Sequence, residues 1–547
     1  MLPISLWLLP VCAALLCWLA WIPQPFTPLL FLAFVPMLYL EQRVTESHIP
    51  QQRRQLWQAA FLFFLLFNLL STGWIFKSTI VGMLFACITN ALLMCLPFML
   101  FHVTRQKFGN RIGYISFVAY WLAFEHLHQR WELAWTWLNL GNALSQYPVF
   151  IQWYEYTGTG GGTLWVLIVN LFVFLAINQY QTTPNLSGRK ERGMLLFRTS
   201  LIPLLLLIVP ILISVQIFNN YTENGTNVEI AIVQPSEDPY QIPDTEAANK
   251  QVDDLLKLAE TVLTPETQYL IFPESALPDA VWLNDFDQDP HIQQLRQWVQ
   301  QYPKLKLVSG ITALMHYPQP KATPSAQPYL QKSGSYDIYN SSMQIDTSQH
   351  EQWYHKSKLV PGVEKIPYRQ LFGFISPLIE SLGGGTGGFA TQPERTVFFG
   401  NDSLGIAPVI CYESIFGQYL TEYVQKGAQL IFVMTNDGWW GNTAGYQQHL
   451  HYASLRAIEC RRSIARAANT GISCFINQRG IIEEHLDWQE KGAIVYKLEA
   501  NTAPTFYVTY GDFIGRTAVL LSSLFILLTF VTRFTPHFAN KLRVPKK

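Results

Sequence analysis

The sequence predicts a membrane protein in which a bundle of apolar helices carries a layered α/β domain. Three observations lead to this class. The 547 residues are 49% hydrophobic and only 14% charged, which is too apolar for an ordinary soluble chain. Eight apolar runs have lengths suited to crossing hydrocarbon as helices. A long block of mixed polarity separates the seventh run from the eighth.

The eight apolar runs define the expected membrane part. The second and fifth are short or end in polar residues, so the number of spanning helices carries an uncertainty of about one. No basic segment precedes the first run, and another apolar run follows it directly, so we expect a retained helix rather than a cleaved signal peptide. The runs are 4–22, 26–41, 55–76, 79–103, 113–127, 162–179, 196–218 and 513–533.

Charge is informative through its distribution. The 38 basic and 38 acidic residues balance, so no overall field favours nucleic acid, and we expect no such partner. Basic residues gather in alternate connections, at 42–54, 104–112 and 180–198 and in the tail, whereas the intervening connections hold little beyond Lys77 and Arg130. The positive-inside rule then predicts that both chain ends face the cytoplasm.

Three parts follow from this pattern. We expect membrane helices one to seven in 1–219, a catalytic domain in 220–510, and the eighth helix with a cytoplasmic tail in 511–547. The same rule places the domain on the far side of the membrane.

Short apolar runs alternate with amphipathic stretches inside the domain, which predicts layered α/β architecture with chemistry at the strand ends. Helices are expected at 247–263 and 448–468. Strands are expected at 228–235, 268–275, 305–312, 405–413, 428–437 and 471–480.

Three residues of the domain supply groups that suit acyl transfer. Glu274 follows "YLIFP", Lys356 lies in "WYHKSKLVP", and Cys411 ends "APVIC". A cysteine nucleophile needs a base for its proton and a stabiliser for the oxyanion. A carboxylate can be the base, and an ammonium can stabilise the oxyanion while lowering the thiol pKa, so we expect an ionised sulfur.

Each of the three residues also has a plainer interpretation. Cys411 alone fits core packing, because free cysteine is among the most buried residue types. Glu274 alone fits an acid at a helix start, and Lys356 alone fits a solvated surface group. Their joint pattern favours a site.

At these residues the chain resembles the nitrilase superfamily, whose Glu-Lys-Cys triad has this chain order. With its membrane flanks it resembles the apolipoprotein N-acyltransferase family within that superfamily. The resemblance implies a nitrilase-like αββα sandwich for the exported domain. It rests on "FPES" (272–275), "YHKSKLVP" (354–361), "ICYES" (410–414), "TNDGWWGNTAGYQQHL" (435–450), "RAIECRRSIARAANTGIS" (456–473) and, in the membrane part, "FEHLHQRWELAWTWLNLGNALSQYP" (124–148).

The resemblance implies roles for the three residues. Glu274 would be the general base, Lys356 the cation that stabilises the oxyanion, and Cys411 the nucleophile that carries the acyl group. Lys358 lies only two residues from Lys356, but Lys356 alone keeps the family's spacing to "LVP".

Four further positions match residues that support the site in the family. Glu364 would help to hold the site, Tyr412 and Glu413 would orient the thiolate or the substrate, and Trp439 would lie at the substrate entrance. Tyr412 and Trp439 fit ordinary packing equally well. The chain departs from the family at "LVPGVEKIP" (359–367), where the loop that gates the site is expected to have a different shape.

The implied reaction starts from a glycerophospholipid, which donates an acyl chain to Cys411. The α-amino group of the N-terminal diacylglyceryl-cysteine of an apolipoprotein then accepts it. We therefore expect a monomeric enzyme without a cofactor in the bacterial inner membrane, with its catalytic domain in the periplasm. Trp135 and Trp137 suit the headgroup level, either as anchors or as substrate contacts.

No competing site is predicted. The pairs His126 with His128 and His449 with His451 have i,i+2 spacing, which turns the rings to different helix faces, and nothing completes a zinc set. The segment "LGGGTGGFA" (382–390) lacks the features of a phosphate loop and is expected to be a mobile loop or lid. If a disulfide forms in the exported domain, Cys460 and Cys474 are the expected pair.

Two other functions fit parts of the pattern. A membrane-tethered amidase would use the same triad but pass the acyl group to water, and would release ammonia from small amides. A transporter with an exported binding domain is disfavoured because the apolar runs hold few ionisable residues, Glu125 being the main exception.

Overall fold

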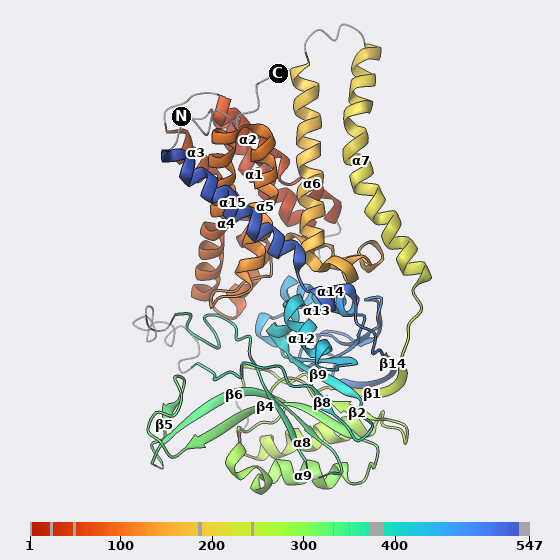
Figure 1. The fold of residues 1–547 in the computed structure, drawn as a ribbon. Helices are drawn as coiled ribbons and strands as arrows, with labels where there is room; N and C mark the ends of the chain where they lie inside the picture. The colour runs from red at the N-terminus through yellow and green to blue at the C-terminus, as the bar shows by residue number, and fades with distance from the viewer. Residues whose placement is uncertain are drawn as a thin grey trace. The chain divides into compact units, whose positions relative to one another are not determined.

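The computed structural model describes residues 3–21, 26–46, 51–183, 189–241, 245–331, 333–348, 350–368, 370 and 388–534. The chain divides into two compact units, which are coloured along the chain in Figure 1. The first, called the helical unit below, comprises Met1–Trp74, Met83–Asn220 and Asp512–Lys547. The second contains the expected catalytic domain and is called the catalytic unit below; it comprises Tyr221–Gly511 together with the short segment Ile75–Gly82.

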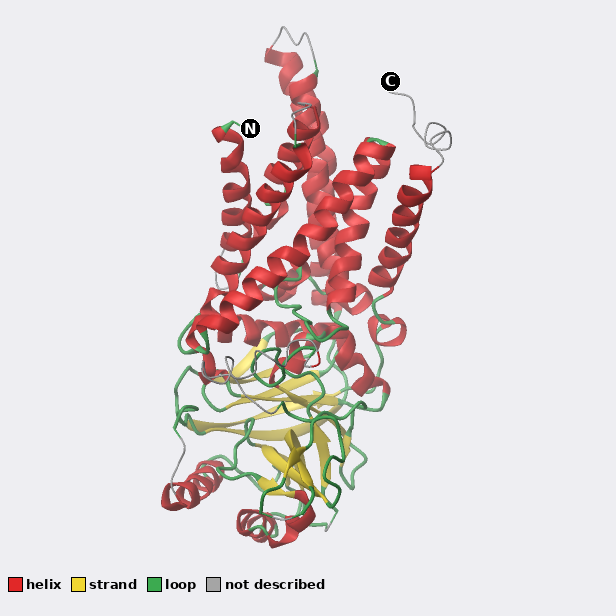
Figure 2. Cartoon of the chain, turned by 90° about the vertical axis from the view of Figure 1, so that its left-hand side faces the viewer, coloured by secondary structure: helices red, strands yellow, loops and turns green. Residues whose placement is uncertain are grey.

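Each of the eight apolar runs contains a helix, and Figure 2 shows these helices in red. Within the described residues, five of them are long and apolar enough to cross a membrane, and α1 is a shorter apolar helix. The full count of eight spanning helices stays a prediction. The helices are α1 (Ile4–Ala20), α2 (Val35–Glu46), α3 (Gln52–Thr72), α4 (Ile80–Phe108), α5 (Asn110–His128), α6 (Tyr154–Thr182), α7 (Arg189–Asn220) and α15 (Phe513–Phe534).

The second apolar run is not one continuous helix, and that prediction was wrong. A 3-10 helix, Thr27–Leu32, precedes α2. Asn170 of α6 bridges the break: its Oδ1 accepts the N–H of Phe34 (2.8 Å), and its Nδ2 donates to the carbonyl of Leu30 (2.8 Å). Backbone groups freed from a helix in apolar surroundings need such partners, so one asparagine makes the interruption tolerable.

Helix α4 is longer than its apolar run and includes two cations that the sequence placed in a connection. Arg105 is buried and pairs with Glu41 of α2, which also contacts Nδ1 of His102 (2.8 Å). Because a lone buried charge is costly, the pairing stabilises the continuation of α4 to Phe108.

Two β-sheets form the centre of the catalytic unit. The first has the order β14-β1-β2-β4-β6-β5, with β3 paired to β4 and β7 paired to β6. The second has the order β13-β12-β11-β10-β9-β8. The first sheet contains β1 (Thr226–Gln234), β2 (Tyr269–Ile271), β3 (Val281–Trp282), β4 (Lys306–Tyr317), β5 (Gln327–Pro328), β6 (Ser335–Ile345), β7 (Gln352–His355) and β14 (Gly492–Ala500). The second contains β8 (Phe398–Phe399), β9 (Gly405–Ile410), β10 (Leu430–Thr435), β11 (Ser463–Ala468), β12 (Ser473–Ile476) and β13 (Ile482–Leu486).

The two sheets pack face to face. The ring of Tyr269 on β2 meets that of Phe432 on β10 with centroids 5.2 Å apart, and Ser342 on β6 contacts the sulfur of Met434 on β10. Helices α8 (Thr245–Glu260) and α9 (Pro290–Val299) share the apolar core of the first sheet, in which Leu255 and Leu295 are fully buried. Helices α12 (Gly417–Gln425) and α13 (Ala444–Cys460) lie beside the second sheet (Figure 1).

The predicted helix 448–468 was wrong in its C-terminal part. Helix α13 ends at Cys460, and Arg461 adopts a left-handed conformation with φ 48°. Residues Ser463–Ala468 then form β11 between β10 and β12, with all six residues buried. Helical spacing continues into this segment, but two neighbouring strands there offer backbone partners.

Each of the six predicted strand segments contains a strand of the two sheets. The other strands of the two sheets were not predicted: β3, β5, β6, β7, β8, β11, β13 and β14. The expected loop or lid at 382–390 lies outside the described residues, apart from 388–390.

Candidate active site

Cys411 occupies a strained turn at the end of a buried strand. All six residues of β9 are buried, and Cys411 follows them with φ 47° and begins a 3-10 helix, Cys411–Ile415. Left-handed backbone is uncommon outside glycine and gathers at functional sites, where surrounding contacts hold it. Here the carbonyl oxygen of Cys411 accepts from Ser414 Oγ (2.8 Å) and lies 3.2 Å from His449 Nε2.

Glu274 lies just beyond β2 and receives three hydrogen bonds. Its Oε1 accepts from Asn340 Nδ2 (2.7 Å) and from Lys356 Nζ (3.1 Å). Its Oε2 accepts from the backbone N–H of Asn436 (3.0 Å). The carboxylate is buried, with 7% of the residue exposed. These donors fix the orientation of the carboxylate.

Gly310 on β4 permits the Glu274 loop to approach the sheet. A Cβ at this position would lie 2.6 Å from the carbonyl oxygen of Pro273 and 2.7 Å from Cα of Glu274. The N–H of Gly310 also donates to that Pro273 oxygen (3.1 Å). Any larger residue would therefore push the carboxylate out of place.

Lys356 follows β7 and bridges two carboxylates. Its Nζ lies 3.1 Å from Glu274 Oε1 and 2.8 Å from Glu364 Oε1. Burial opposes the charge on Lys356, but the Glu274 and Glu364 carboxylates outweigh it and raise the pKa well above the usual value. Lys356 therefore remains an ammonium and cannot act as the base.

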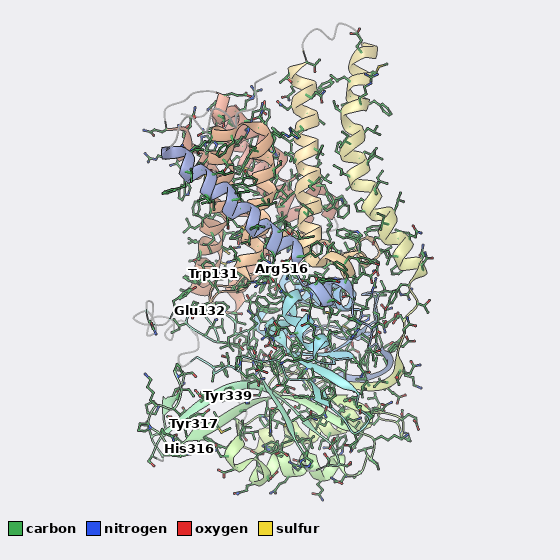
Figure 3. The ribbon with its side chains drawn as sticks, viewed as in Figure 1. Trp131, Glu132, His316, Tyr317, Tyr339 and Arg516 are labelled. Atoms are coloured by element: carbon green, nitrogen blue, oxygen red, sulfur yellow. The ribbon has the colours of Figure 1, made fainter. Side chains whose placement is uncertain are left out.

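Strand β6 supports the end of β7. Tyr339, labelled in Figure 3, stacks on His355 with ring centroids 4.2 Å apart. The hydroxyl of Tyr339 also lies 3.1 Å from that of Tyr317 on β4. The backbone carbonyl oxygen of Asn340 accepts the N–H of Lys356 (2.8 Å). The lysine thus has a defined backbone position next to the sheet.

The expectation of an ionised sulfur was wrong. Burial raises the pKa of the Cys411 thiol most, Glu274 raises it further, and Lys356 and a hydrogen bond from Thr435 lower it only in part. The net pKa lies well above the usual value because desolvation outweighs the ammonium. The resting sulfur is a neutral thiol, which needs a base.

Glu413 connects the Cys411 turn to the lysine segment. Its Oε2 accepts the N–H of Ile410 (3.0 Å), and its Oε1 accepts the N–H of Ser357 (2.7 Å) and the hydroxyls of Tyr354 (2.5 Å) and Tyr419 (2.7 Å). The carboxylate is fully buried. Protein donors therefore occupy it, and it positions the turn rather than meeting substrate.

Glu364 holds both the lysine and its own loop. Its Oε1 accepts from Lys356 (2.8 Å) and Asn340 Nδ2 (3.1 Å), and its Oε2 accepts the N–H of Val360 (2.7 Å). Lys358 lies elsewhere, with its Nζ 5.1 Å from the ring of Phe416 and a pKa that burial lowers to about 8. Lys356 is the lysine that contacts Glu274.

Tyr412 and Trp439 differ in exposure. Tyr412 is buried, and its ring lies edge-on to Phe416 with centroids 5.2 Å apart. Trp439 is 41% exposed. Its carbonyl oxygen accepts from Ser78 Oγ (2.8 Å) and Tyr240 OH (3.1 Å), so its backbone is held while much of its ring remains open to solvent.

A buried chain of hydrogen bonds behind Cys411 was missed by the sequence analysis. His449 joins Ser414 Oγ (2.8 Å from Nε2) to Asp437 (2.9 Å from Nδ1), and Arg466 Nη2 contacts the other Asp437 oxygen at 2.6 Å. Burial opposes the charge of Asp437, but Arg466 and His449 prevail and lower its pKa to about 2. These residues come from separate elements, so no spacing in the sequence links them to Cys411.

Asn340 was also missed, although it donates to both carboxylates of the site. It lies within β6, a strand that the sequence analysis did not predict. Its neighbours in sequence are ordinary strand residues, so no local signal could have found it.

The remaining candidate groups lie outside this site. Cys460 and Cys474, the expected disulfide pair, are free buried thiols. His126 contacts Asp512 within the helical unit (2.5 Å). Among the residues that the structure describes, no three His, Cys, Asp or Glu side chains are grouped to hold a metal ion.

Comparison with known proteins identifies the class of protein to which the chain belongs. A family model described as carbon-nitrogen hydrolase matches residues 229–505, so the chain belongs to this family. A second model, the apolipoprotein N-acyltransferase N-terminal domain, matches residues 13–172. With both matches in one chain, the protein is a member of the apolipoprotein N-acyltransferase family.

Relatives of that name extend over nearly the whole chain. The apolipoprotein N-acyltransferase of Chlorobaculum tepidum is 26% identical over 521 residues, which cover 94% of each chain. That of Thermotoga maritima is 25% identical and covers 92% of this chain and 89% of its own. A nitrilase-superfamily protein of Saccharomyces cerevisiae with a solved structure is 16% identical, covers 51% of this chain and 93% of its own, and has a TM-score of 0.35.

Proposed function

We propose that this protein transfers an acyl chain from a glycerophospholipid, through a thioester on Cys411, to the α-amino group of the N-terminal diacylglyceryl-cysteine of apolipoproteins. The observation that carries the proposal is the Glu274–Lys356 ion pair, which acts on a buried neutral thiol at a strained strand end. Family membership supports the same reaction.

The first half-reaction forms the thioester. Glu274 takes the proton of Cys411 as the sulfur attacks the donor's ester carbonyl, and the Lys356 ammonium stabilises the oxyanion. When the carbon–oxygen bond breaks, the proton on Glu274 passes to the departing alkoxide. The products are acylated Cys411 and a lysophospholipid.

The second half-reaction regenerates the enzyme. The acceptor amine attacks the thioester carbonyl, and Glu274 takes the amine proton while Lys356 again stabilises the oxyanion. The bond from carbon to sulfur then breaks, and the proton returns to the sulfur. Because the lysophospholipid leaves before the acceptor amine reacts with the acyl-enzyme, the kinetics are ping-pong. Glu274 is the base in both halves, and Glu364 and Glu413 hold Lys356 and the Cys411 turn in position.

The membrane location in this proposal follows from the long apolar chains of the phospholipid donor. Each methylene withdrawn from apolar surroundings costs about 0.8 kcal/mol, so the acyl chains stay in the bilayer while the carbonyl reaches Cys411. We place eight helices in the bacterial inner membrane, with both chain ends in the cytoplasm and the catalytic unit in the periplasm. The enzyme acts as a monomer without a cofactor.

The direct test is mass spectrometry of the purified protein. Incubation with phospholipid alone should add one fatty-acyl group to the peptide that contains Cys411, and a diacylated lipopeptide should then remove it and become triacylated. Cys411→Ala should abolish both events, whereas Cys460→Ala, at another buried free thiol, should preserve them. An adduct on Cys460, or ammonia release from small amides without transfer, would refute the proposal.

A further inference from the structure

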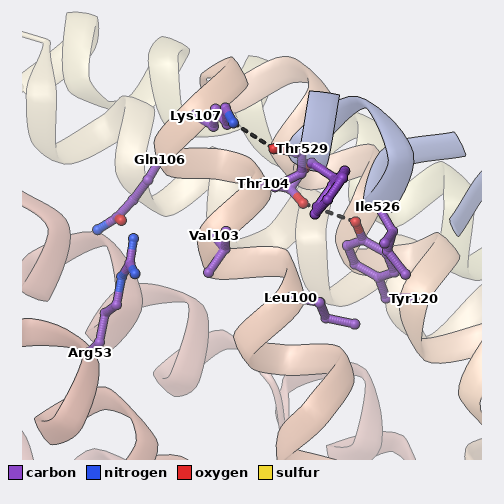
Figure 4. A pocket seen from close by; sticks show the side chains of 10 residues that line it. Arg53, Leu100, Val103, Thr104, Gln106, Lys107, Tyr120, Ile526 and Thr529 are labelled. Carbon is purple, nitrogen blue, oxygen red and sulfur yellow. Dashed lines mark hydrogen bonds between the residues drawn. The ribbon is translucent and has the colours of Figure 1, made fainter. Parts of the chain in front are cut away.

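A groove on the helical unit has features of a lipid site that acyl transfer does not use. Its volume is about 620 Å³, and residues of α3, α4, α5 and α15 line it (Figure 4). The lining is apolar along Leu100, Val103, Ile526 and Phe530. Leu100, Ile526 and Phe530 are at least 37% exposed, so this surface is open along the outside of the helices.

Two cations line the same groove. Arg53 lies in the first turn of α3, and Lys107 lies in the last turn of α4. Figure 4 shows the guanidinium of Arg53 directed toward Gln106 and the side chain of Lys107 directed toward Thr529. Lys107 Nζ donates to the carbonyl of Thr529 on α15 (2.6 Å), which fixes its ammonium at the groove wall.

Arg53 is available to a ligand. Its side chain is exposed, and within the described part of the chain it has no hydrogen bond or ion pair. The first turn of α3 contains no acid, so the positive end of that helix dipole is not neutralised there. A guanidinium beside a helix N-terminus is a favourable place for a phosphate.

The two features together select one ligand class. Inorganic phosphate would use the cations but leave the apolar wall uncovered, and a plain hydrocarbon chain would leave the cations unused. A lipid with a net negative headgroup uses both, because its phosphate can meet Arg53 and Lys107 while an acyl chain covers Leu100 and Phe530. A net negative lipid also gains more from two cations than a zwitterionic lipid does.

We propose that this groove binds one anionic phospholipid, with the phosphate at Arg53 and Lys107 and an acyl chain along α4 and α15. The lipid bridges α15 to the helices that precede the catalytic unit in the chain. The site lies in the helical unit and is independent of the Cys411 chemistry.

Native mass spectrometry of the full-length protein tests this site. A Cys411→Ala background prevents acyl transfer from altering the lipids. The protein is mixed with equal amounts of phosphatidylglycerol and phosphatidylcholine that have identical acyl chains, and retained lipid is counted. We expect preferential retention of one phosphatidylglycerol, and Arg53→Gln should reduce that preference about fivefold.

The matched control is Arg54→Gln, which removes the neighbouring exposed arginine that does not line the groove. It should leave the preference unchanged. Arg53→Gln breaks no described contact, so misfolding does not confuse the result. Equal retention of both lipids by the parent, or equal losses in the two variants, would overturn the proposal. Displacement of phosphatidylglycerol by excess inorganic phosphate would do so too, because it would indicate a free-phosphate site.

Discussion

At the scale of single residues, the proposed chemistry depends on which atoms hold protons at rest. The Cys411 thiol is neutral because burial dominates its pKa, and Lys356 is charged because two carboxylates surround it. Glu274 touches the lysine and acts electrostatically on the thiol, so it is the group that can move a proton between sulfur and substrate.

Glu274→Gln should slow formation of the Cys411 thioester by about 100-fold to 10,000-fold, the usual contribution of a positioned base. The amide keeps an oxygen that can accept from Asn340 or Asn436, so folding should be preserved. Quenched-flow mass spectrometry of the acylated peptide measures the rate. A variant that acylates at the parental rate would remove Glu274 from the base role.

The raised pKa of Cys411 predicts the pH dependence of its alkylation. The reactive thiolate fraction of a group titrating above the measured range rises about tenfold per pH unit. Iodoacetamide labelling of the Cys411 peptide should therefore accelerate steadily from pH 7 to pH 9, as mass spectrometry can follow. A plateau within that range would mean that Lys356 stabilises the thiolate more than burial opposes it.

At the scale of secondary-structure elements, strand ends and turns hold the site through buried polar contacts. The β9 turn is held by Glu413 from within and by His449 of α13 from behind. His449 is itself oriented by Asp437, which Arg466 of β11 neutralises. This series of hydrogen bonds, from Arg466 through Asp437 to His449, positions the Cys411 backbone without touching substrate.

His449→Gln should lower the rate of thioester formation about tenfold while leaving KM for phospholipid unchanged, because the carbonyl of Cys411 loses a partner. A purely structural role would instead lower Tm without such a split. His451→Gln is the matched control on the same helix, since His451 lies outside this hydrogen-bonded chain. Its rate of thioester formation and its KM for phospholipid should both equal those of the parent protein.

Arg466→Met should destabilise the catalytic unit by about 3–5 kcal/mol, because it leaves the buried Asp437 carboxylate without its cation. The loss should shrink as the pH falls. The pKa of folded Asp437 is about 2 against an ordinary 3.8, so its pairing stabilises fully above 3.8 and is lost as pH falls toward 2. Thermal unfolding at several pH values measures the destabilisation and its dependence on pH. A destabilisation that stays constant as the pH falls would contradict the role given to the Asp437 charge.

At the scale of the whole molecule, the proposed function needs the catalytic unit on the periplasmic side of an inner membrane. Leu330→Cys places a thiol at a position that is 95% exposed on the catalytic unit. In cells with a permeabilised outer membrane, an impermeant maleimide should label it, whereas Arg54→Cys should be labelled only after the inner membrane is opened. The reversed pattern would invert the proposed topology.

The sequence by itself determined the features that depend on local composition. Apolar runs specified where apolar helices form, and strand-like runs placed Glu274 and Cys411, the candidate site residues, at or just beyond the ends of β2 and β9. Such signals survive in one dimension because helix and strand periods, and the cost of burying charge, act on neighbouring residues.

The tertiary structure decided whatever depends on contacts between distant segments. Asn170 allows the break before α2, two adjacent strands convert 463–468 from helix to β11, and Asn340 joins Glu274 to Glu364. Desolvation, which exists only once the chain has folded around Cys411, raises the thiol pKa that the ammonium alone would have lowered.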